Sequence, residues 1–347
     1  MKYKGFSKKE LKRVYNLICT SRILDEKQLV LLKQGKGFFH IGASGHEAVQ
    51  VAAGLNIKTG SDFSYPYYRE QTYCLTLGMT VKELLLAFLA KKNDPSSAGR
   101  QMPMHYGHRE FNIVSQSSPT GTQYLQAVGT AFAMQKNKKG NVVYVSSGDG
   151  TTSQGDFHEA LNWASRQKAP VIFHIENNHY AISVPLHEQV ANGQLYDITS
   201  GYENLGRYNI DGTNFFESHL AFKKAIDRAR KGKGPSIIIS DVVRLLPHSS
   251  SDDHRKYREE KDLSIDKSRD PILIFEKFCI DNQILTDHDI QSIQNKIKSE
   301  IDDAALWAQS QELPDSSTAN KFLFSQSDSL VFRKKEILDD QQKIVMV

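Results

Sequence analysis

The chain alternates between two hydrophobic patterns, which predict helices and strands in turn. Near the N-terminus apolar residues recur at helical spacing, Ser7 and Glu10 have the spacing of a capping box, and Gly35 closes the segment. Continuous β-branched and aromatic runs are instead typical of strands that are buried on both faces. We expect such strands at residues 141–147, 170–177 and 235–245.

Helical patterns separate these buried runs. Thr286 and Asp289 have capping spacing at the start of the last long helix. Beyond the N-terminal helix, helices are expected at residues 45–57, 81–92, 123–137, 155–168 and 215–232, and across 263–312. Alternation of strands and helices implies a parallel sheet. The predicted fold is α/β, with a central parallel sheet, helices on both faces, and helical N- and C-terminal regions.

Two stretches lack a periodic pattern. Residues 93–122 are rich in small and polar side chains, and a long unpatterned stretch inside a compact domain is more often a functional loop than an accident. From Pro314 on, the chain becomes polar and rich in Ser and Asp. We expect one domain over residues 1–325 and a polar tail or linker over residues 326–347.

Composition excludes several classes of function. The net charge of +4 is spread over 44 basic and 40 acidic residues, so no nucleic-acid partner is expected. The longest apolar run, residues 84–90, is too short to cross a bilayer, and no apolar secretory segment opens the chain. Cys19, Cys74 and Cys279 match no zinc or disulfide spacing. These features predict reduced thiols, a cytoplasmic location and no membrane association.

Polar residues follow two of the predicted strands. Gly148-Asp149-Gly150 ends one strand and Asn177-Asn178 ends the next, with one crossover helix between them. The two carboxyl ends should therefore be neighbours, where open α/β sheets bind their ligands. A carboxylate beside an amide oxygen suits Mg²⁺, and glycines let phosphate oxygens approach the backbone. Gly-Asp-Gly alone is more typical of a strand-to-helix turn with Asp as N-cap, but the paired asparagines at this spacing favour the metal and diphosphate site.

The segment GDGTTSQGDFHEALNWASRQKAPVIFHIENN (148–178) resembles the thiamine diphosphate signature. From about residue 8 to 325, the chain is similar to the alpha subunit of the 2-oxoacid dehydrogenase (decarboxylating) first component. Three segments resemble the branched-chain (2-oxoisovalerate) subgroup more than the pyruvate one: residues 99–107, 117–123 and 244–258. The resemblance implies a thiamine-diphosphate-binding fold and oxidative decarboxylation of 2-oxoacids.

The resemblance also implies roles for the residues at the two strand ends. Asp149, Asn178 and the backbone carbonyl of Tyr180 would ligate Mg²⁺. Gly148 and Gly150 would lie against the diphosphate.

Further cofactor contacts are implied elsewhere in the chain. Arg69 would hold a phosphate, for which its planar fork is suited, and Tyr68 would line the cofactor site. Without the family match, a surface salt bridge would explain Arg69 equally well. Ser118 and Thr120 would meet the aminopyrimidine ring.

Ser117, Pro119, Thr122 and Gln123 match a monovalent-cation (K⁺) site that some members of the family contain. A loop rich in hydroxyl groups also satisfies its own backbone, and this alternative stays open.

His248 is the implied catalytic residue, reaching the cofactor and assisting acyl transfer to lipoyl. A single histidine is usually a surface or core residue, but this one follows a strand end, and imidazole is suited to proton transfer near neutrality. The chain departs from the family nearby: Leu246-Pro247 replaces a commoner Gly-His, which is expected to stiffen the loop. Glu176 stands where some branched-chain members have a phosphate-binding Arg, so that contact is expected to be lost. Ser249 aligns with a serine that is phosphorylated in some relatives.

In this two-chain family the activating glutamate lies on the beta subunit. The chain is therefore expected to be half of an active site, working as an α₂β₂ heterotetramer with a lipoyl acyltransferase component. Its last residues, KIVMV, resemble the lead-in to a beta subunit. We hypothesise that the chain is the alpha half of a natural alpha–beta fusion or was cut from one, and a separate beta subunit stays the alternative.

Three other functions compete with this interpretation. A non-catalytic scaffold would bind the cofactor without turnover. A nicotinamide-dependent dehydrogenase would carry Gly-x-Gly-x-x-Gly between a strand and a helix, and the sequence has no such motif. A pyruvate-preferring enzyme of the same family stays an alternative, because hydrophobic pockets discriminate a few methylenes by only about 1–3 kcal/mol.

Overall fold

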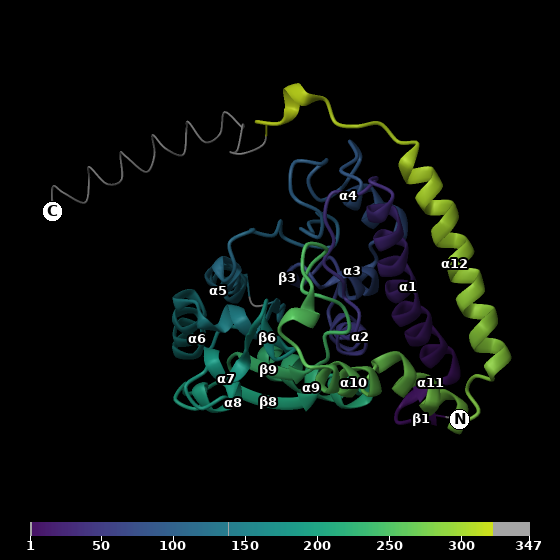
Figure 1. Ribbon diagram of the computed structural model, residues 1–347. Helices are drawn as coiled ribbons and strands as arrows, with labels where there is room; N and C mark the ends of the chain where they lie inside the picture. The colour runs from purple at the N-terminus through teal and green to yellow at the C-terminus, as the bar shows by residue number, and fades with distance from the viewer. Residues whose placement is uncertain (1, 138, 322–347) are drawn as a thin grey trace.

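The computed structural model describes residues 2–137 and 139–321, and its centre is a five-stranded sheet (Figure 1). The strand order is β3-β4-β5-β9-β8, and every neighbouring pair is parallel. The strands are β3 (Phe63–Tyr65), β4 (Val143–Gly148), β5 (Val171–Asn177), β9 (Ser236–Asp241) and β8 (Gly206–Asp211). The predicted α/β class and parallel sheet are confirmed.

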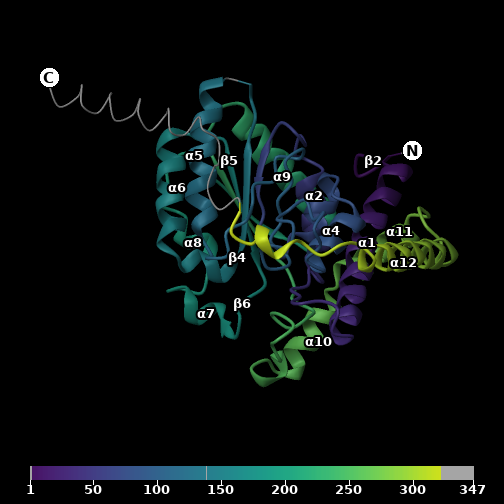
Figure 2. The ribbon, with the colours of Figure 1, turned by 90° about the horizontal axis from the view of Figure 1, so that it is seen from above.

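Helices cover both faces of the sheet (Figure 2). Successive residues of β4 pack on opposite sides, because side chains alternate along a strand. Val143 and Val145 contact a core that includes Phe157, whereas Tyr144 contacts the core that includes Phe222. The first face is covered by α5 (Thr122–Asn137) and α6 (Gly155–Gln167), and the second by α2 (Glu47–Gly54) and α9 (Phe215–Arg230).

A second helical layer lies beyond α2 and α9 (Figures 1 and 2). It contains α1 (Lys8–Lys33), α11 (Pro271–Asp281) and α12 (Asp287–Gln309), with α3 (Gln71–Leu77) and α4 (Val81–Phe88) beside them. Both predicted capping boxes are present, at Ser7 with Glu10 and at Thr286 with Asp289. The predicted helical N- and C-terminal regions are confirmed.

The remaining elements are short. Two hairpins are formed by β1 (Lys2–Tyr3) with β2 (Phe6–Ser7) and by β6 (Tyr180–Ala181) with β7 (Val184–Pro185). The short helices are η1 (Asp149–Ser153), α7 (Leu186–Gln189), α8 (Leu195–Ile198), η2 (His254–Lys256), α10 (Glu260–Ser268) and η3 (Ser316–Thr318).

Some predicted bounds were wrong. The strand expected to reach residue 245 ends at Asp241, because its neighbour β5 ends at Asn177 and the amide of Val242 makes the last bond across, to the Asn177 carbonyl. The helix expected over 45–57 spans only Glu47–Gly54. Residues 90–121, all of them described, hold only isolated bridges, as predicted for the long loop.

Other predictions concern thiols, membranes and the tail. All three cysteines are unpaired and buried. Among the residues that the structure describes, no helix has both the length and the apolar character needed to cross a membrane. The predicted tail over 326–347 and its proposed link to a beta subunit lie outside the described residues.

The capping box of α12 gives a stability prediction. The Thr286 hydroxyl accepts from the Asp289 amide at 3.1 Å, so Thr286→Ala removes a cap and should lower the free energy of unfolding by about 1 kcal/mol. Thr286→Ser keeps the hydroxyl and should retain most of the stabilisation that the cap contributes. Urea denaturation compares the two variants, and an equal loss in both would contradict the capping role.

Candidate active site

The two predicted metal ligands meet at the carboxyl edge of the sheet. Asp149 follows β4 and is 1% exposed, and Asn178 follows β5 and is 6% exposed. Gly148 and Glu176 are register partners on the two strands, so Asp149 and the Asn177-Asn178 pair follow at the same edge of the sheet. One crossover helix thus brings the two side chains together, as the sequence predicted.

Asp149 carries an oxygen that no described residue satisfies. Its Oδ2 accepts from Nε2 of Gln189 at 3.3 Å, while its Oδ1 is buried without a hydrogen-bond partner among the described residues. Burial raises the pKa of this carboxyl. An unsatisfied buried oxygen costs about 1–3 kcal/mol, so the site fits a cation that would bind it. Oδ1 of Asn178 accepts one bond, from the Tyr180 amide at 3.3 Å, and so keeps a lone pair.

The two glycines of the motif have different physical reasons. A Cβ on Gly150 would lie 2.5 Å from Cβ of Ala181, so η1 can pack against β6 only if residue 150 has no side chain. A Cβ on Gly148 would meet no protein atom closer than 3.8 Å, at Tyr67. The fold itself therefore requires Gly150, whereas a methyl group at residue 148 would make only ordinary contacts, so packing alone does not require Gly148.

Arg69 is a buried cation without a carboxylate partner. It is 2% exposed, and its guanidinium donates to the backbone carbonyls of Gly42 and His248, both at 2.9 Å. None of the ion pairs formed by described residues involves Arg69. Its alternative role as a surface salt bridge is wrong, and an uncompensated cation in this position favours an anionic ligand.

Arg244 is a second buried cation, which sequence reasoning missed. It is 1% exposed and donates to the Ile182 carbonyl at 2.9 Å and to the Tyr257 hydroxyl at 2.7 Å, while its Nε has no partner among the described residues. Burial and the nearby Arg69 lower the pKa of Arg244. In the sequence it stood inside the strand expected to reach residue 245 and opened the segment 244–258, but no pattern marked it as a buried cation.

His248 lies against this pair of cations. Its Nδ1 is 3.2 Å from a terminal nitrogen of Arg69, and its ring meets that of Tyr68 edge-on at 6.1 Å between centroids. Burial, Arg69 and Arg244 lower the pKa of His248 to about 4. The imidazole is therefore neutral at neutral pH. Because guanidinium can only donate, Nδ1 accepts and the proton resides on Nε2.

Hydrogen bonds around Asp252 shape the loop that carries His248. One carboxylate oxygen of Asp252 accepts from the His248 amide at 2.7 Å and from the Tyr257 hydroxyl at 2.5 Å. Arg258 donates to the Arg244 carbonyl at 3.0 Å and pairs with Asp266 at 2.6 Å. The loop is thereby tied to Arg244 at one end and to α10 at the other.

The remaining predicted cofactor contacts lie on the rim of this buried site. Tyr68 is half-buried. Ser118 and Thr120 are exposed, and the Ser118 hydroxyl is 2.6 Å from Nε2 of His105. Their loop abuts the start of α6, because a Cβ on Gly121 would lie 3.0 Å from Cβ of Gln154. The loop is therefore close to the strand ends without entering the buried part.

The predicted monovalent-cation residues bond to one another and to their own backbone. The Thr122 hydroxyl donates to the Pro119 carbonyl at 3.1 Å. Gln123 accepts from the Gly121 amide at 3.1 Å and donates to the Ser146 carbonyl at 3.2 Å. These hydrogen bonds are the ones expected if the loop satisfies its own backbone instead of holding a cation. The K⁺ site therefore stays a prediction.

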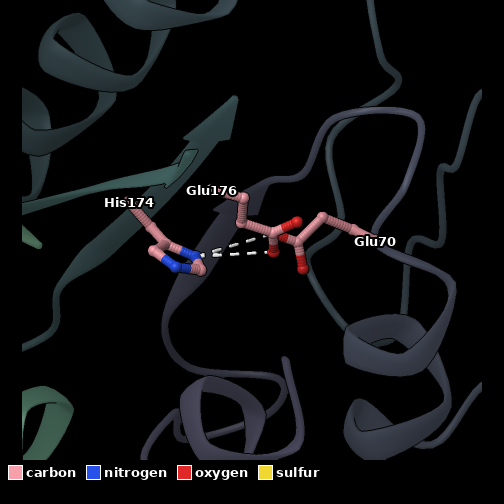
Figure 3. A group of neighbouring side chains, drawn as sticks. All are labelled: Glu70, His174 and Glu176. Carbon is pink, nitrogen blue, oxygen red and sulfur yellow. Dashed lines mark ion pairs between the residues drawn. The ribbon is translucent and has the colours of Figure 1, made fainter. Parts of the chain in front are cut away.

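Glu176 stands where some branched-chain members have a phosphate-binding Arg, and the sequence predicted no other role for it. In the structure it belongs to a buried cluster behind the site. It is 0% exposed, as are Glu70 and His174, and the three side chains converge from β5 and from the turn after Arg69 (Figure 3). Sequence patterns did not indicate this cluster, since Glu70 lies about 100 residues before His174 and Glu176 on β5.

Comparison with known proteins gives consistent matches. Residues 15–317 match the family described as "Dehydrogenase E1 component". The chain is 39% identical over 300 residues to "2-oxoisovalerate dehydrogenase subunit alpha" of Bacillus subtilis (strain 168), covering 86% of this chain and 91% of that protein. It is 32% identical over 309 residues to "2-oxoisovalerate dehydrogenase subunit alpha 2, mitochondrial" of Arabidopsis thaliana, covering 87% of this chain and 64% of that protein, which is less than two thirds.

A pyruvate-type relative is less similar to this chain than the Bacillus subtilis relative is. The "Pyruvate dehydrogenase E1 component subunit alpha" of Staphylococcus aureus (strain Mu50 / ATCC 700699) is 33% identical over 284 residues, covering 81% of this chain and 73% of that protein.

The two glycines of the Asp149 turn make a matched pair of variants. Gly150→Ala forces the new methyl group into Ala181 and should lower the free energy of unfolding by about 1–3 kcal/mol. Gly148→Ala meets only ordinary contacts, so it should leave the melting temperature unchanged while weakening the binding of a diphosphate. Thermal unfolding and diphosphate titration measure both. Equal destabilisation by the two substitutions would contradict the difference in packing between Gly148 and Gly150.

The histidine beside the two arginines gives a pH prediction. Its folded pKa of about 4 lies below the ordinary 6.5, so the unfolded chain takes up the proton first. Stability should therefore fall as pH drops from about 6.5 to 4, and His248→Asn should remove that part of the fall. Inorganic pyrophosphate should raise the pKa of His248 by neutralising Arg69 and Arg244. Titration of the histidine NMR signals, with the His248 signal assigned from His248→Asn, measures both pKa values. A pKa of His248 near 6.5 without pyrophosphate would contradict the lowering by burial and the two arginines.

Proposed function

The chain belongs to the dehydrogenase E1 component family, and from that membership we propose that it is the alpha subunit of a branched-chain 2-oxoacid dehydrogenase. The enzyme would decarboxylate 2-oxoacids oxidatively, with thiamine diphosphate and Mg²⁺, and pass the acyl group to a lipoyl group on an acyltransferase partner. The 2-oxoisovalerate relative of Bacillus subtilis, at 39% identity against 33% for the pyruvate-type relative, supports the branched-chain substrate class.

One observation carries this proposal: buried charges of both signs lie at the sheet edge without a counter-charge among the described residues. Within that part of the chain, Oδ1 of Asp149 lacks a donor, and Arg69 and Arg244 lack a carboxylate partner. A magnesium–diphosphate group has the complementary charges, a divalent cation for the carboxylate and anionic oxygens for the guanidinium groups. The residues present therefore fit the cofactor that the family uses.

In this proposal the strand ends hold the metal and the arginine side holds the phosphates. Asp149 and Asn178 would ligate Mg²⁺ through side-chain oxygens, with the Tyr180 carbonyl as a third ligand. Arg69 would bind phosphate oxygens, and the backbone at Gly148 and Gly150 would lie against the diphosphate. Thiamine diphosphate, when bound, supplies the carbanion chemistry of decarboxylation. The protein supplies the orientation and the electrostatics.

His248 would move a proton at the reacting end. Its imidazole is neutral at neutral pH and carries the proton on Nε2, so it is a donor to developing negative charge during acyl transfer. Asp252 fixes the backbone of His248, and Tyr68 lines the site beside it. Ser118 and Thr120 on the rim would contact the aminopyrimidine ring.

A beta subunit would complete the site in an α₂β₂ assembly. Large apolar side chains are exposed in the hairpin after Asn178 and in the long loop: Met102 (48%), Ile182 (56%) and Val184 (41%). A partner that covers them would also exclude water from the cofactor. We further propose that residues 1–325 form one cofactor-binding domain, that residues 117–123 bind K⁺, and that the complex acts in the cytoplasm.

The functional test combines the chain with its cognate beta subunit, thiamine diphosphate and Mg²⁺. Reduction of an artificial electron acceptor is followed with 2-oxoisovalerate, 2-oxoisocaproate and pyruvate. We expect kcat/KM to be about 10- to 200-fold higher for the branched acids than for pyruvate. Asp149→Ala should lower it roughly 100-fold.

Two results would contradict the proposal in different ways. A preference for pyruvate would move the chain to the pyruvate-type enzymes. Cofactor binding without turnover of any 2-oxoacid would indicate a non-catalytic scaffold.

A further inference from the structure

His105 is a buried histidine in the long loop, and the proposed function gives it no role. It is 8% exposed, and its Nε2 lies 2.6 Å from the hydroxyl of Ser118, an exposed residue that is proposed to meet the cofactor. Its Nδ1 lies 3.3 Å from the Pro103 carbonyl oxygen. Both ring nitrogens are therefore engaged, one by the serine hydroxyl and the other by the backbone of the same segment.

The segment that carries His105 is anchored in the core. Its two neighbours, Met104 and Tyr106, are 3% and 2% exposed, and both belong to the core that includes Phe222. The Tyr106 hydroxyl also donates to Sδ of Met104 at 3.4 Å. Because close packing fixes the residue on each side, the imidazole between them is held in place.

Other hydrogen bonds lay the segment before Ser118 against the segment of His105. The Gln116 amide donates to the Tyr106 carbonyl at 3.2 Å, and Nε2 of Gln101 donates to the Gln116 carbonyl at 2.9 Å. The bond from Ser118 to His105 continues this series toward the exposed part of the loop.

The opposite end of the Ser118 loop is fixed to the sheet. Nε2 of Gln123 donates to the Ser146 carbonyl in β4 at 3.2 Å, and its Oε1 accepts from the Gly121 amide at 3.1 Å. Ser118 therefore lies between two fixed points, with β4 on one side and His105 on the other. The histidine bond fixes the half of the loop that lies farther from β4 along the chain.

The two partners of His105 also determine the direction of the Ser118 hydroxyl. A carbonyl oxygen can only accept, so the neutral imidazole carries its proton on Nδ1 and donates it to the Pro103 carbonyl. Nε2 is then the acceptor, and the Ser118 hydroxyl donates its proton to it. Oγ of Ser118 keeps its lone pairs, so the exposed serine is an acceptor for an N–H group.

We propose that His105 is a positioning residue, which holds Oγ of Ser118 as an acceptor for an amino group on the ring half of the bound cofactor. The diphosphate half would be bound elsewhere, by Arg69 and through a metal at Asp149 and Asn178. His105 should therefore affect the binding of the ring half and leave the binding of the diphosphate half unchanged. This role rests on the proposed function, whereas the arrangement of His105 and Ser118 does not.

The arrangement is tested without cofactor, by nitrogen NMR of the histidine rings in the full-length chain at mildly alkaline pH, where imidazole is neutral. The His105 signals are those that disappear in His105→Gln. We expect the chemical shifts of a ring that is protonated on Nδ1, and Ser118→Ala should move the Nε2 signal because its donor is lost. A ring protonated on Nε2 would make the serine oxygen the acceptor from His105 and would overturn the proposed direction of the bond.

The positioning role is tested by binding, with the chain, its cognate beta subunit and Mg²⁺. Thiamine diphosphate contains the ring half, whereas inorganic pyrophosphate does not. His105→Leu and Ser118→Ala should each weaken thiamine diphosphate binding by roughly 2- to 10-fold, as expected for one lost hydrogen bond, and leave pyrophosphate binding unchanged. The double variant should bind no more weakly than either single variant, because both remove the same contact.

Two further variants separate the hydrogen bond from the shape of the side chain. His105→Gln places an acceptor oxygen near the former position of Nε2 and should restore the affinity for thiamine diphosphate. His288→Leu makes the same exchange as His105→Leu at an exposed position on α12. It is the matched control and should change the affinity for neither ligand.

Each other outcome overturns a defined part of the inference. Equal weakening of both ligands would make His105 a support of the fold and not a positioning residue for the ring half. Unchanged binding of thiamine diphosphate in His105→Leu and Ser118→Ala would remove the role altogether. If His105→Leu does not fold, Ser118→Ala still decides, because residue 118 is exposed. Absence of thiamine diphosphate binding in the wild type would overturn the proposed function, whereas the NMR measurement would still decide the arrangement of the pair.

Discussion

Charge that is buried without a counter-charge in the described part of the chain, at the carboxyl edge of the sheet, is the constraint on which the rest of the structure depends. Asp149 and Arg69 have opposite charges, yet each is almost fully buried and none of the ion pairs among the described residues joins them. Isolated buried charges are costly, so a fold retains them only where rigid surroundings hold them for a ligand. The parallel sheet supplies these surroundings because neighbouring strands end side by side.

Three local arrangements hold the residues of the site in place. Gly150 lets β6 approach the Asp149 turn, which brings Tyr180 beside the residues proposed to bind the metal. Asp252 and Tyr257 hold the loop that presents His248 to Arg69. Gln50 joins the arginine segment to the strand that leads to Asn178, because its Nε2 donates to the Arg69 carbonyl and to the carboxyl oxygens of Glu176. Each arrangement acts on a group that would contact the cofactor, and none of the three requires the cofactor to be present.

The sequence predicted those parts of the structure that have a local or periodic cause. Buried strands β4 and β5 are continuous apolar runs, and one crossover between them was enough to place Asp149 beside Asn178. Strands β3 and β8 were missed, since β3 has three residues and β8 is largely polar and half-buried. Arg244 and Glu70 were missed for another reason: the absence of a counter-charge, or of a donor, is a property of the folded neighbourhood. No pattern along the chain records it.

The central claim is that the strand ends and Arg69 form one magnesium–diphosphate site. The most direct test is a crystal structure of the chain with its beta subunit, thiamine diphosphate and Mn²⁺ in place of Mg²⁺, with the metal located by anomalous scattering. The account predicts one strong peak within bonding distance of Asp149 and Asn178, with phosphate oxygens against Arg69. A peak among Glu70, His174 and Glu176, or no ordered metal at the strand ends, would contradict it.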